Sequence, residues 1–458
     1  MNEEATIDDT RKSAAKMRTH KRAHGDGNRT DLVTAVSLHR AGEFDKAEQL
    51  YQRLLTTKPD HVEALHFLGV LYHQRGQSER AVKSIKAAIA LAPNYADAHN
   101  NLGNVLKESN QLEPALRAYR RVVAINPDHA DAWNNLGVLL RGQGHYDEAD
   151  KAYAAALALN PTLAVAWQNR GNLLARINRL EDAVAAYSRV LALQPRNTAA
   201  YDALGKTLHR ARKVEQAIEV YRQWLQANPD SSVARHMLAA CTGEAIPARA
   251  SDGYVRDVFD GFAGSFDQVL DQLGYRAPSL IRELLERTLP QPNASLIIAD
   301  AGCGTGLCAD FLRPRANKLV GVDLSSGMLA RARARNTYDQ LVEAELSTWL
   351  ASQPDAYDLI VSADTLCYFG SLEGALSGAA SALRPGGLLV FTVEKASESV
   401  GAYELHPSGR YSHAEHYVRE GLARATLTLL AVEQVVLRRE GGQEVNGLLV
   451  SALRPRDH

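Results

Sequence analysis

Residues 296–306, Leu-Ile-Ile-Ala-Asp-Ala-Gly-Cys-Gly-Thr-Gly, join an apolar run to three glycines at every second position. The run ends in an acid, Asp300, and a helical pattern begins at Leu307. Glycine lets the backbone turn sharply and lets a ligand lie against it. We therefore predict a strand, a glycine loop and a helix that present backbone groups to a nucleotide-like ligand.

A second apolar run, 318–322, ends in Asp323. An acid at the end of the second strand is placed to accept hydrogen bonds from two ribose hydroxyls. The alternative for Asp323 is a helix N-cap, which the same residue type favours.

Strand and helix patterns alternate from residue 295 to residue 453, which predicts a mostly parallel, covered sheet. Gly441 and Gly442 separate the last two strands and indicate a hairpin. We therefore expect a seven-stranded α/β sheet that closes with one antiparallel edge strand. The seven predicted strands are 296–300, 318–322, 341–345, 358–362, 387–394, 431–438 and 445–453.

The first half of the chain repeats with a period of 34 residues. Small Gly and Ala residues recur at this step, where two short helices of one unit cross closely, and an aromatic residue follows the alanine in most units. Proline ends the second helix of each unit because it has no N–H to donate. Such units stack into an all-α solenoid. The prolines are Pro59, Pro93, Pro127, Pro161, Pro195 and Pro229.

This register resembles the tetratricopeptide repeat. We predict six units and a capping helix over 28–242, preceded by a disordered tail over 1–27. The resemblance implies a groove that binds a protein or peptide. Asn101, Asn135 and Asn169 recur at a groove position and are predicted to bind a peptide backbone, although the same residues also bond between neighbouring helices.

Four ordered motifs resemble the class I S-adenosylmethionine-dependent methyltransferases: the glycine loop, Gly321-Val-Asp323, Tyr357-Asp358-Leu-Ile-Val and Leu383-Arg-Pro-Gly-Gly387. The resemblance implies a Rossmann-like methyltransferase domain over 291–458 with S-adenosyl-L-methionine as cofactor. A dinucleotide-binding loop instead requires a glycine at position 307, where this chain has leucine.

The resemblance assigns cofactor binding to Asp300, Gly302, Cys303, Gly304, Gly306, Asp323, Leu324, Glu345 and Asp364. Asp300 is expected to orient the methionine amine, directly or through water. Leu324 is expected to pack on the adenine, and Glu345 to contact its amino group, with Glu343 as the alternative.

The methyl acceptor is not identified by the sequence, and a general base is needed only if the acceptor is protonated. The candidate catalytic residues are Tyr368, Glu394, His406 and His413. The polar and aromatic stretch 403–413, predicted to be a loop, is the best candidate for the acceptor site.

Residues 243–252 break the repeat and predict a linker. The following stretch, 253–290, predicts helices with aromatic residues at 259, 262 and 266 on one face. These helices either dock the repeats to the next domain or form a lid over the ligand site, and both roles are compatible.

Composition narrows the classes of partner. With 52 basic and 53 acidic residues, the chain has no basic excess that favours nucleic acid. It has no apolar run of 18 residues, which argues against a membrane-spanning helix. Its four scattered cysteines lack metal-ligand spacing, so we expect no metal site and a reducing, cytoplasmic location.

Three functions follow for the whole chain. The leading hypothesis is an active methyltransferase whose repeats recruit a protein, as substrate or as scaffold, and the domain order is similar to that of predicted bacterial repeat-containing methyltransferases. The second keeps the catalytic domain but takes a small molecule as acceptor. The third is a non-catalytic adaptor that binds the cofactor.

Overall fold

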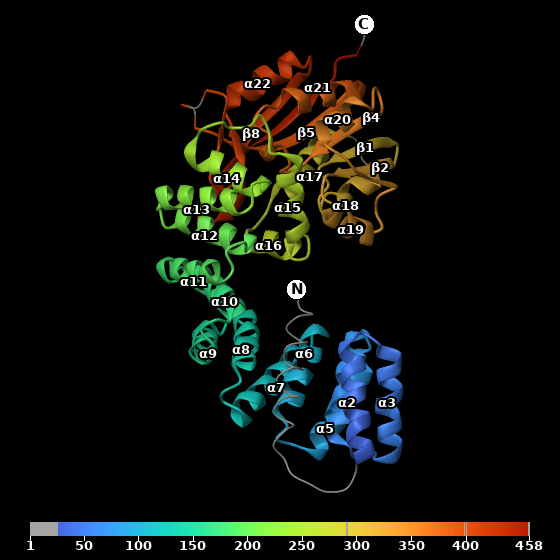
Figure 1. Cartoon of the computed structure of the whole chain (residues 1–458). Helices are drawn as coiled ribbons and strands as arrows, with labels where there is room; N and C mark the ends of the chain where they lie inside the picture. Colours follow the sequence, from blue (N-terminus) through green and yellow to red (C-terminus); the bar gives the residue numbers. More distant parts are fainter. Residues whose placement is uncertain (1–25, 290–291, 398, 400, 457–458) are drawn as a thin grey trace. The chain divides into compact units, whose positions relative to one another are not determined.

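The computed structural model describes residues 26–289, 292–397, 399 and 401–456 (Figure 1). The chain forms two compact units, one ending at Gln194 and the other beginning at Pro195. The tail predicted over 1–27 lies outside the described residues as far as residue 25, whereas residues 26 and 27 belong to the first described helix.

The first unit consists of helix pairs that follow the 34-residue period. Its helices are α2 (Asp26–Arg40), α3 (Phe44–Thr57), α4 (Val62–Gln74), α5 (Ser78–Leu91), α6 (Ala96–Glu108), α7 (Leu112–Ile125), α8 (Ala130–Gly142), α9 (Tyr146–Leu159), α10 (Ala164–Arg176) and α11 (Leu180–Leu193).

Glycine and tyrosine meet where the helices of a pair cross. A Cβ atom on Gly137 of α8 would lie 2.7 Å from the ring of Tyr153 on α9. Tyr153 and Ala149, both on α9, are fully buried. The same contact joins Gly103 to Tyr119. The predicted pairing of a small residue with an aromatic ring is therefore confirmed in these pairs.

Replacing Gly137 with alanine is expected to destabilise the first unit by about 1–3 kcal/mol, because the added methyl group overpacks the crossing with Tyr153. Gly142 ends the same helix, and a Cβ there would meet no described atom within 4 Å. Gly142→Ala should therefore stabilise the helix slightly, by about 0.4–1 kcal/mol. Scanning calorimetry of the full chain compares the two variants, and equal shifts would contradict this account.

The second unit begins with six helices that lie together in Figure 1 beside the sheet. They are α12 (Thr198–Arg210), α13 (Val214–Ala227), α14 (Ser232–Thr242), α15 (Asp252–Phe262), α16 (Phe266–Gln272) and α17 (Ala277–Thr288).

Nine strands among the described residues form one sheet. They are β1 (Leu296–Ala301), β2 (Ala316–Asp323), β3 (Gln340–Glu343), β4 (Tyr357–Ser362), β5 (Leu383–Lys395), β6 (Tyr403–Leu405), β7 (Tyr411–His413), β8 (Thr428–Glu440) and β9 (Gln443–Leu453). The connections carry α18 (Ala309–Leu312), η2 (Arg313–Arg315), α19 (Ser326–Ala334), α20 (Leu346–Ala351), η3 (Leu366–Tyr368), α21 (Glu373–Ala382) and α22 (Glu415–Arg424).

Strands β3, β2, β1, β4 and β5 are neighbours in that order, and they are parallel, as predicted. The predicted hairpin at Gly441 and Gly442 joins β8 to β9. However, the antiparallel strand β9 is not an edge strand, because it pairs with both β5 and β8. Its residues 447–452 are buried without alternation, which is typical of an interior strand.

The two further strands arise from the segment predicted to be a loop. Residues 403–413 form the short hairpin β6–β7, and β7 runs parallel to the end of β5. The sheet therefore has nine strands instead of seven, while the predicted α/β class is confirmed.

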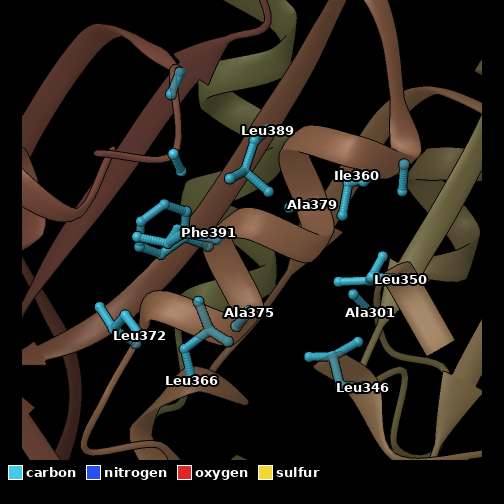
Figure 2. Packing of buried hydrophobic residues seen from close by; sticks show 14 of the residues in the cluster. Ala301, Leu346, Leu350, Ile360, Leu366, Leu372, Ala375, Ala379, Leu389 and Phe391 are labelled. Carbon is cyan, nitrogen blue, oxygen red and sulfur yellow. The ribbon is translucent and has the colours of Figure 1, made fainter. Parts of the chain in front are cut away.

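Both faces of the sheet are covered by apolar side chains. On one face, Leu389 and Phe391 of β5 pack with Ala375 and Ala379 of α21 (Figure 2). On the other face, a separate cluster unites α17 and α18 with buried residues of β1, β4 and β5. Because apolar side chains pack on both faces, the strands are held in place, and so are the loops that follow them.

The segment 243–252, predicted to be a linker, is hydrogen-bonded to the part of its unit that contains the sheet. The N–H of Ala250 donates to the carbonyl of Tyr368 (2.8 Å), and Gly370 donates to Ala248 (2.9 Å). In the preceding helix α14, His236 bonds through Nε2 to the carbonyl of Gly409 (2.9 Å). These contacts join α14 and the predicted linker to the sheet, in agreement with their place in the second unit.

Candidate active site

The glycine loop lies between β1 and α18, and its three glycines have positive φ angles: +78° at Gly302, +53° at Gly304 and +90° at Gly306. The N–H of Gly302 donates to the carbonyl of Val322 on β2 (2.8 Å). A Cβ on Gly302 would lie 2.1 Å from the Thr365 side chain, after β4. The loop is therefore pressed between two strand ends, and a side chain at 302 has no room.

Asp323 stands at the end of β2, on the wall of a cavity. Its carboxylate accepts the N–H of Gly304 and the N–H of Ser325, both at 2.9 Å. Burial raises the pKa of Asp323. The N-cap alternative is wrong, because the hydroxyl of Ser325 caps α19 by accepting the N–H of Met328 (3.1 Å).

Asp300 lies behind the glycine loop and is almost fully buried. It accepts a hydrogen bond from the hydroxyl of Tyr338 (2.6 Å). Burial raises the pKa of Asp300 to about 7, against the opposing effect of the Tyr338 bond. Sequence reasoning missed Tyr338, since an isolated tyrosine before a strand carries no signal for this contact.

The other predicted cofactor residues divide into two groups. Leu324 and Glu345 line the cavity, as do two of the loop glycines, whereas Cys303 and Gly306 are absent from its described lining. Glu345 also caps α20, accepting the N–H of Thr348 (2.8 Å). Its alternative, Glu343, is exposed, so the structure favours Glu345.

Asp364 follows β4 with a φ angle of +54° and also lines the cavity. It pairs with Arg438 of β8 (2.6 Å). Arg438 is nearly inaccessible and also pairs with Glu394 and with Glu440 (2.6 Å). Arg410, from the turn of the β6–β7 hairpin, pairs with the same two glutamates, each at 2.6 Å.

These five residues form a charged network beside the cavity, with three carboxylates and two guanidinium groups. Burial raises the pKa of Asp364. Burial alone would lower the pKa of Arg438, but the surrounding carboxylates hold it above its ordinary value. Sequence reasoning missed Arg438 and Glu440. The sequence shows only that Arg438 ends the predicted strand 431–438 and that Glu440 follows it, which does not indicate a buried ion pair.

The four catalytic candidates do not come together. Tyr368 lines the cavity, with its ring edge-on to Phe259 at 5.2 Å, and Glu394 belongs to the charged network. His406 bonds to the hydroxyl of Ser412 (2.6 Å). His413 is buried and bonds to the carbonyl of Gly370 (3.1 Å).

Neither histidine is among the described residues that line the cavity. Burial lowers the pKa of His413 to about 4, so this ring is neutral at neutral pH. Both histidines form hydrogen bonds within or beside the β6–β7 hairpin. Of the described hairpin residues, only those of the turn line the cavity, namely Pro407, Ser408 and Arg410.

Helices α15 and α16 lie at the glycine-loop end of the cavity and form hydrogen bonds with the residues there. Phe259, Phe262 and Phe266 line the cavity. Asp260 of α15 accepts the N–H of Gly327 at the start of α19 (2.9 Å), and Asp267 of α16 accepts the hydroxyl of Thr305 in the glycine loop (2.5 Å). The aromatic face predicted as a lid or a packing surface is thus in contact with the loop.

The recurring asparagines of the first unit bond between repeats. Asn101 contacts His66 (2.8 Å), and Asn169 donates to Asn134 (3.0 Å). Asn135 donates to Asn104 at 3.4 Å. Each amide therefore already has a partner in the preceding repeat, and peptide binding through these residues stays a prediction.

Two searches of the described residues gave negative results. No group of three or more His, Cys, Asp or Glu residues in this part of the chain is arranged to hold a metal ion. No helix within the same residues is long and apolar enough to cross a membrane.

Comparison with known proteins agrees with this architecture. Residues 299–391 match the family model of a methyltransferase domain, so the glycine loop and Asp323 belong to such a domain. The chain as a whole combines this domain with tetratricopeptide repeats. The matching repeat models cover residues 35–62, 69–109, 103–144, 130–163 and 169–232.

Methyltransferase-like protein 27 of Homo sapiens is 34% identical over 144 residues, which are 31% of this chain and 58% of that protein. Malonyl-[acyl-carrier protein] O-methyltransferase of Priestia megaterium (strain DSM 319 / IMG 1521) is 32% identical over 162 residues, 34% of this chain and 55% of that protein. The chain thus spans little more than half the length of these curated relatives. The crystal structure of MamA shares 27% identity at a TM-score of 0.33 and covers 35% of this chain and 94% of its own.

Proposed function

We propose that the second unit binds S-adenosyl-L-methionine and transfers its methyl group to an acceptor. The observation that carries this proposal is the position of Asp323, whose carboxylate is held beside the N–H of Gly304 on the wall of a cavity. A carboxylate there accepts hydrogen bonds from ribose hydroxyls, and the glycine backbone leaves space for the ligand.

S-adenosylmethionine supplies a methyl group activated by a cationic sulfonium: the acceptor's electron pair bonds to the methyl carbon as the C–S bond breaks, and that bond's pair stays on sulfur. The chain's part is to bind and to align, and alignment is worth about 7–11 kcal/mol in well-oriented reactions. Asp323 would hold the ribose, Leu324 would pack on the adenine, and Asp300 would orient the methionine amine, directly or through water.

An orphaned polar atom supports the fit of a cationic ligand. Oδ1 of Asp364 is buried and has no hydrogen-bond partner within the described residues, although Oδ2 pairs with Arg438. A buried acceptor without a partner is rare in proteins. A protonated amine or an N–H group of a bound molecule would satisfy it, while the aromatic residues of α15 and α16 would exclude water.

The repeats, in this proposal, recruit a protein that is either the methyl acceptor or a scaffold, and the chain acts in a reducing compartment such as the cytoplasm, where its four unpaired cysteines remain thiols.

Calorimetric titration of the full chain with S-adenosylmethionine tests the proposal directly. Saturable binding at one site, followed by transfer of tritiated methyl label to an extract component, is the expected result. A chain that binds no S-adenosylmethionine would contradict it, and binding without transfer to any extract would leave the adaptor hypothesis instead.

Cofactor affinity is expected to depend on the ionisation of Asp300. Its pKa is raised to about 7 by burial, and the cationic cofactor favours the ionised form. Affinity should therefore fall about tenfold for each unit of pH below 7. The Tyr338 bond lowers this pKa, so Tyr338→Phe should move the midpoint to higher pH, and Asp300→Asn should abolish the dependence.

Titrations across a range of pH measure this effect. Asp310→Asn is the matched control, since Asp310 is an exposed acid on α18. A profile that is unchanged by Tyr338→Phe would show that Asp300 does not govern binding.

A further inference from the structure

One cavity of about 1660 Å³ joins the glycine loop to the last helix pair of the repeats. At one end its wall contains Gly304 and Asp323, and at the other Thr198 and Ala199 of α12 and Trp224 of α13. Ligand sites for small molecules typically measure about 300–1,000 Å³. The cavity therefore has room for a second, larger ligand beside a nucleotide-like cofactor, along α12 and α13.

The repeat end of this cavity carries polar atoms that lack partners. Nε1 of Trp224, Oδ1 of Asn228 and Oδ1 of Asp202 are buried and make no hydrogen bond within the described residues. Trp224 itself is 3% exposed, and its N–H can only donate, whereas the two oxygens accept. A polypeptide backbone offers both an acceptor and a donor at every residue except proline, which matches this mixed set.

The last repeat departs from the others at these positions. Asn160 and Asn126 occupy the position of Asn228 two and three repeats earlier, and each accepts the N–H of the residue two ahead, at 3.1 and 3.3 Å, which closes the turn. Asn228 leaves this oxygen free of such a bond in the described structure. Trp224 stands where the other repeats carry aliphatic residues, namely Leu54, Ala88, Val122, Ala156 and Val190.

Direct contacts connect the repeat end of the cavity to its glycine-loop end. His236 of α14 bonds to the carbonyl of Gly409, and its ring contacts the ring of Tyr254 on α15 in a tilted arrangement with centroids 4.0 Å apart. A Cβ on Gly409, whose φ angle is +80°, would lie 2.1 Å from the hydroxyl of Tyr254. The next residue, Arg410, lies on the cavity wall. A ligand seated on α12 and α13 is therefore a fixed distance from the charged network.

From these observations we propose that the methyl acceptor is a side chain of a polypeptide, whose backbone lies on α12 and α13 and whose acceptor residue enters the cavity. The inference rests on the proposed methyl transfer. A nitrogen, oxygen or sulfur atom of that side chain gives the electron pair for the new bond to the methyl carbon. The C–S bond breaks with its pair on sulfur, and any proton on the attacking atom passes to water.

The test uses the full chain, tritiated S-adenosylmethionine, and an extract separated into macromolecules and small molecules. Ala199→Trp narrows the repeat end, because Ala199 is exposed on α12 and lines the cavity. Gln216→Trp is the matched control, since Gln216 is exposed on α13 and is not in the described lining. Trp224→Phe removes the N–H but keeps an aromatic ring.

We expect protease-sensitive label in macromolecules for the wild type and for Gln216→Trp. Ala199→Trp should lower its rate about tenfold or more, as loss of one central contact does at interfaces, and Trp224→Phe should raise KM more than it lowers kcat. Calorimetry should give equal cofactor affinity in all four proteins. Label that is confined to small molecules, sensitive to nuclease, or absent while the cofactor binds would overturn the inference and leave cofactor binding intact. A wild type that binds no cofactor would instead fail the proposed function.

Discussion

Asp323→Ala is expected to weaken S-adenosylmethionine binding by about 100-fold or more. The substitution removes a charged acceptor for two ribose hydroxyls, and each such hydrogen bond contributes about 1.5–3 kcal/mol. A loss of about 3 kcal/mol corresponds to roughly 100-fold in the dissociation constant. It also frees the N–H groups of Gly304 and Ser325, which both donate to this carboxylate at 2.9 Å.

A matched control lies on the neighbouring strand. Glu343 pairs in register with Asp323, one strand further toward the edge, and its side chain is exposed. Glu343→Ala should leave the dissociation constant unchanged. Calorimetric titration measures both variants, and circular dichroism verifies that each is folded. Near-equal affinities for Asp323→Ala and the wild type would show that the ribose lies elsewhere.

The glycine loop and the repeats could be predicted because their geometry is encoded over short distances. Positive φ angles at Gly302, Gly304 and Gly306 and the crossing of Gly137 with Tyr153 each depend on residue type at a fixed spacing. Such a spacing can be read from a single sequence, because it does not depend on which distant residues come into contact in the fold.

The charged network could not be predicted in this way. Asp364 and Arg438 are 74 residues apart, and they meet only in the folded sheet, in which β9 lies between β5 and β8. The sequence predicted the β8–β9 hairpin but placed its antiparallel strand at the edge, and strand order is a property of the whole sheet. Likewise, nothing local joins Tyr338 to Asp300.

Residues 403–413 were predicted to be an acceptor loop, but in the structure they form the hairpin β6–β7. Its polar and aromatic residues indicated an acceptor loop, and Arg410 does reach the cavity. Yet His413 is fully buried, and Tyr411 bonds to the carbonyl of Pro247 (2.8 Å). The aromatic residues of 403–413 therefore serve in part to bind the segment that contains Pro247, and not only to contact a ligand.

Arg438→Met is expected to destabilise the second unit by about 3–5 kcal/mol, the usual cost of removing one partner from a buried ion pair. The substitution leaves Glu394 and Glu440 paired with Arg410, whereas Asp364 loses the one ion-pair partner that it has among the described residues. Desolvation of an unpaired carboxylate opposes folding more strongly than the methionine side chain favours it. In scanning calorimetry of the full chain, the melting temperature should fall by about 10 °C.

The adjacent residue Arg439 is the matched control, because its replacement removes one positive charge without breaking a buried ion pair. Arg439 is exposed and pairs with exposed Glu444 (2.7 Å), so Arg439→Met should change stability by about 0–1 kcal/mol. The pH dependence adds a second criterion. Without Arg438, the folded-state pKa of Asp364, already raised by burial, should rise further. A raised carboxyl pKa gives stability that is full below the unfolded value and is lost as pH rises through the folded value. The loss in free energy of unfolding caused by Arg438→Met should therefore become smaller as pH falls. A loss that does not change with pH would show that the substitution acts through packing and not through an unpaired carboxylate.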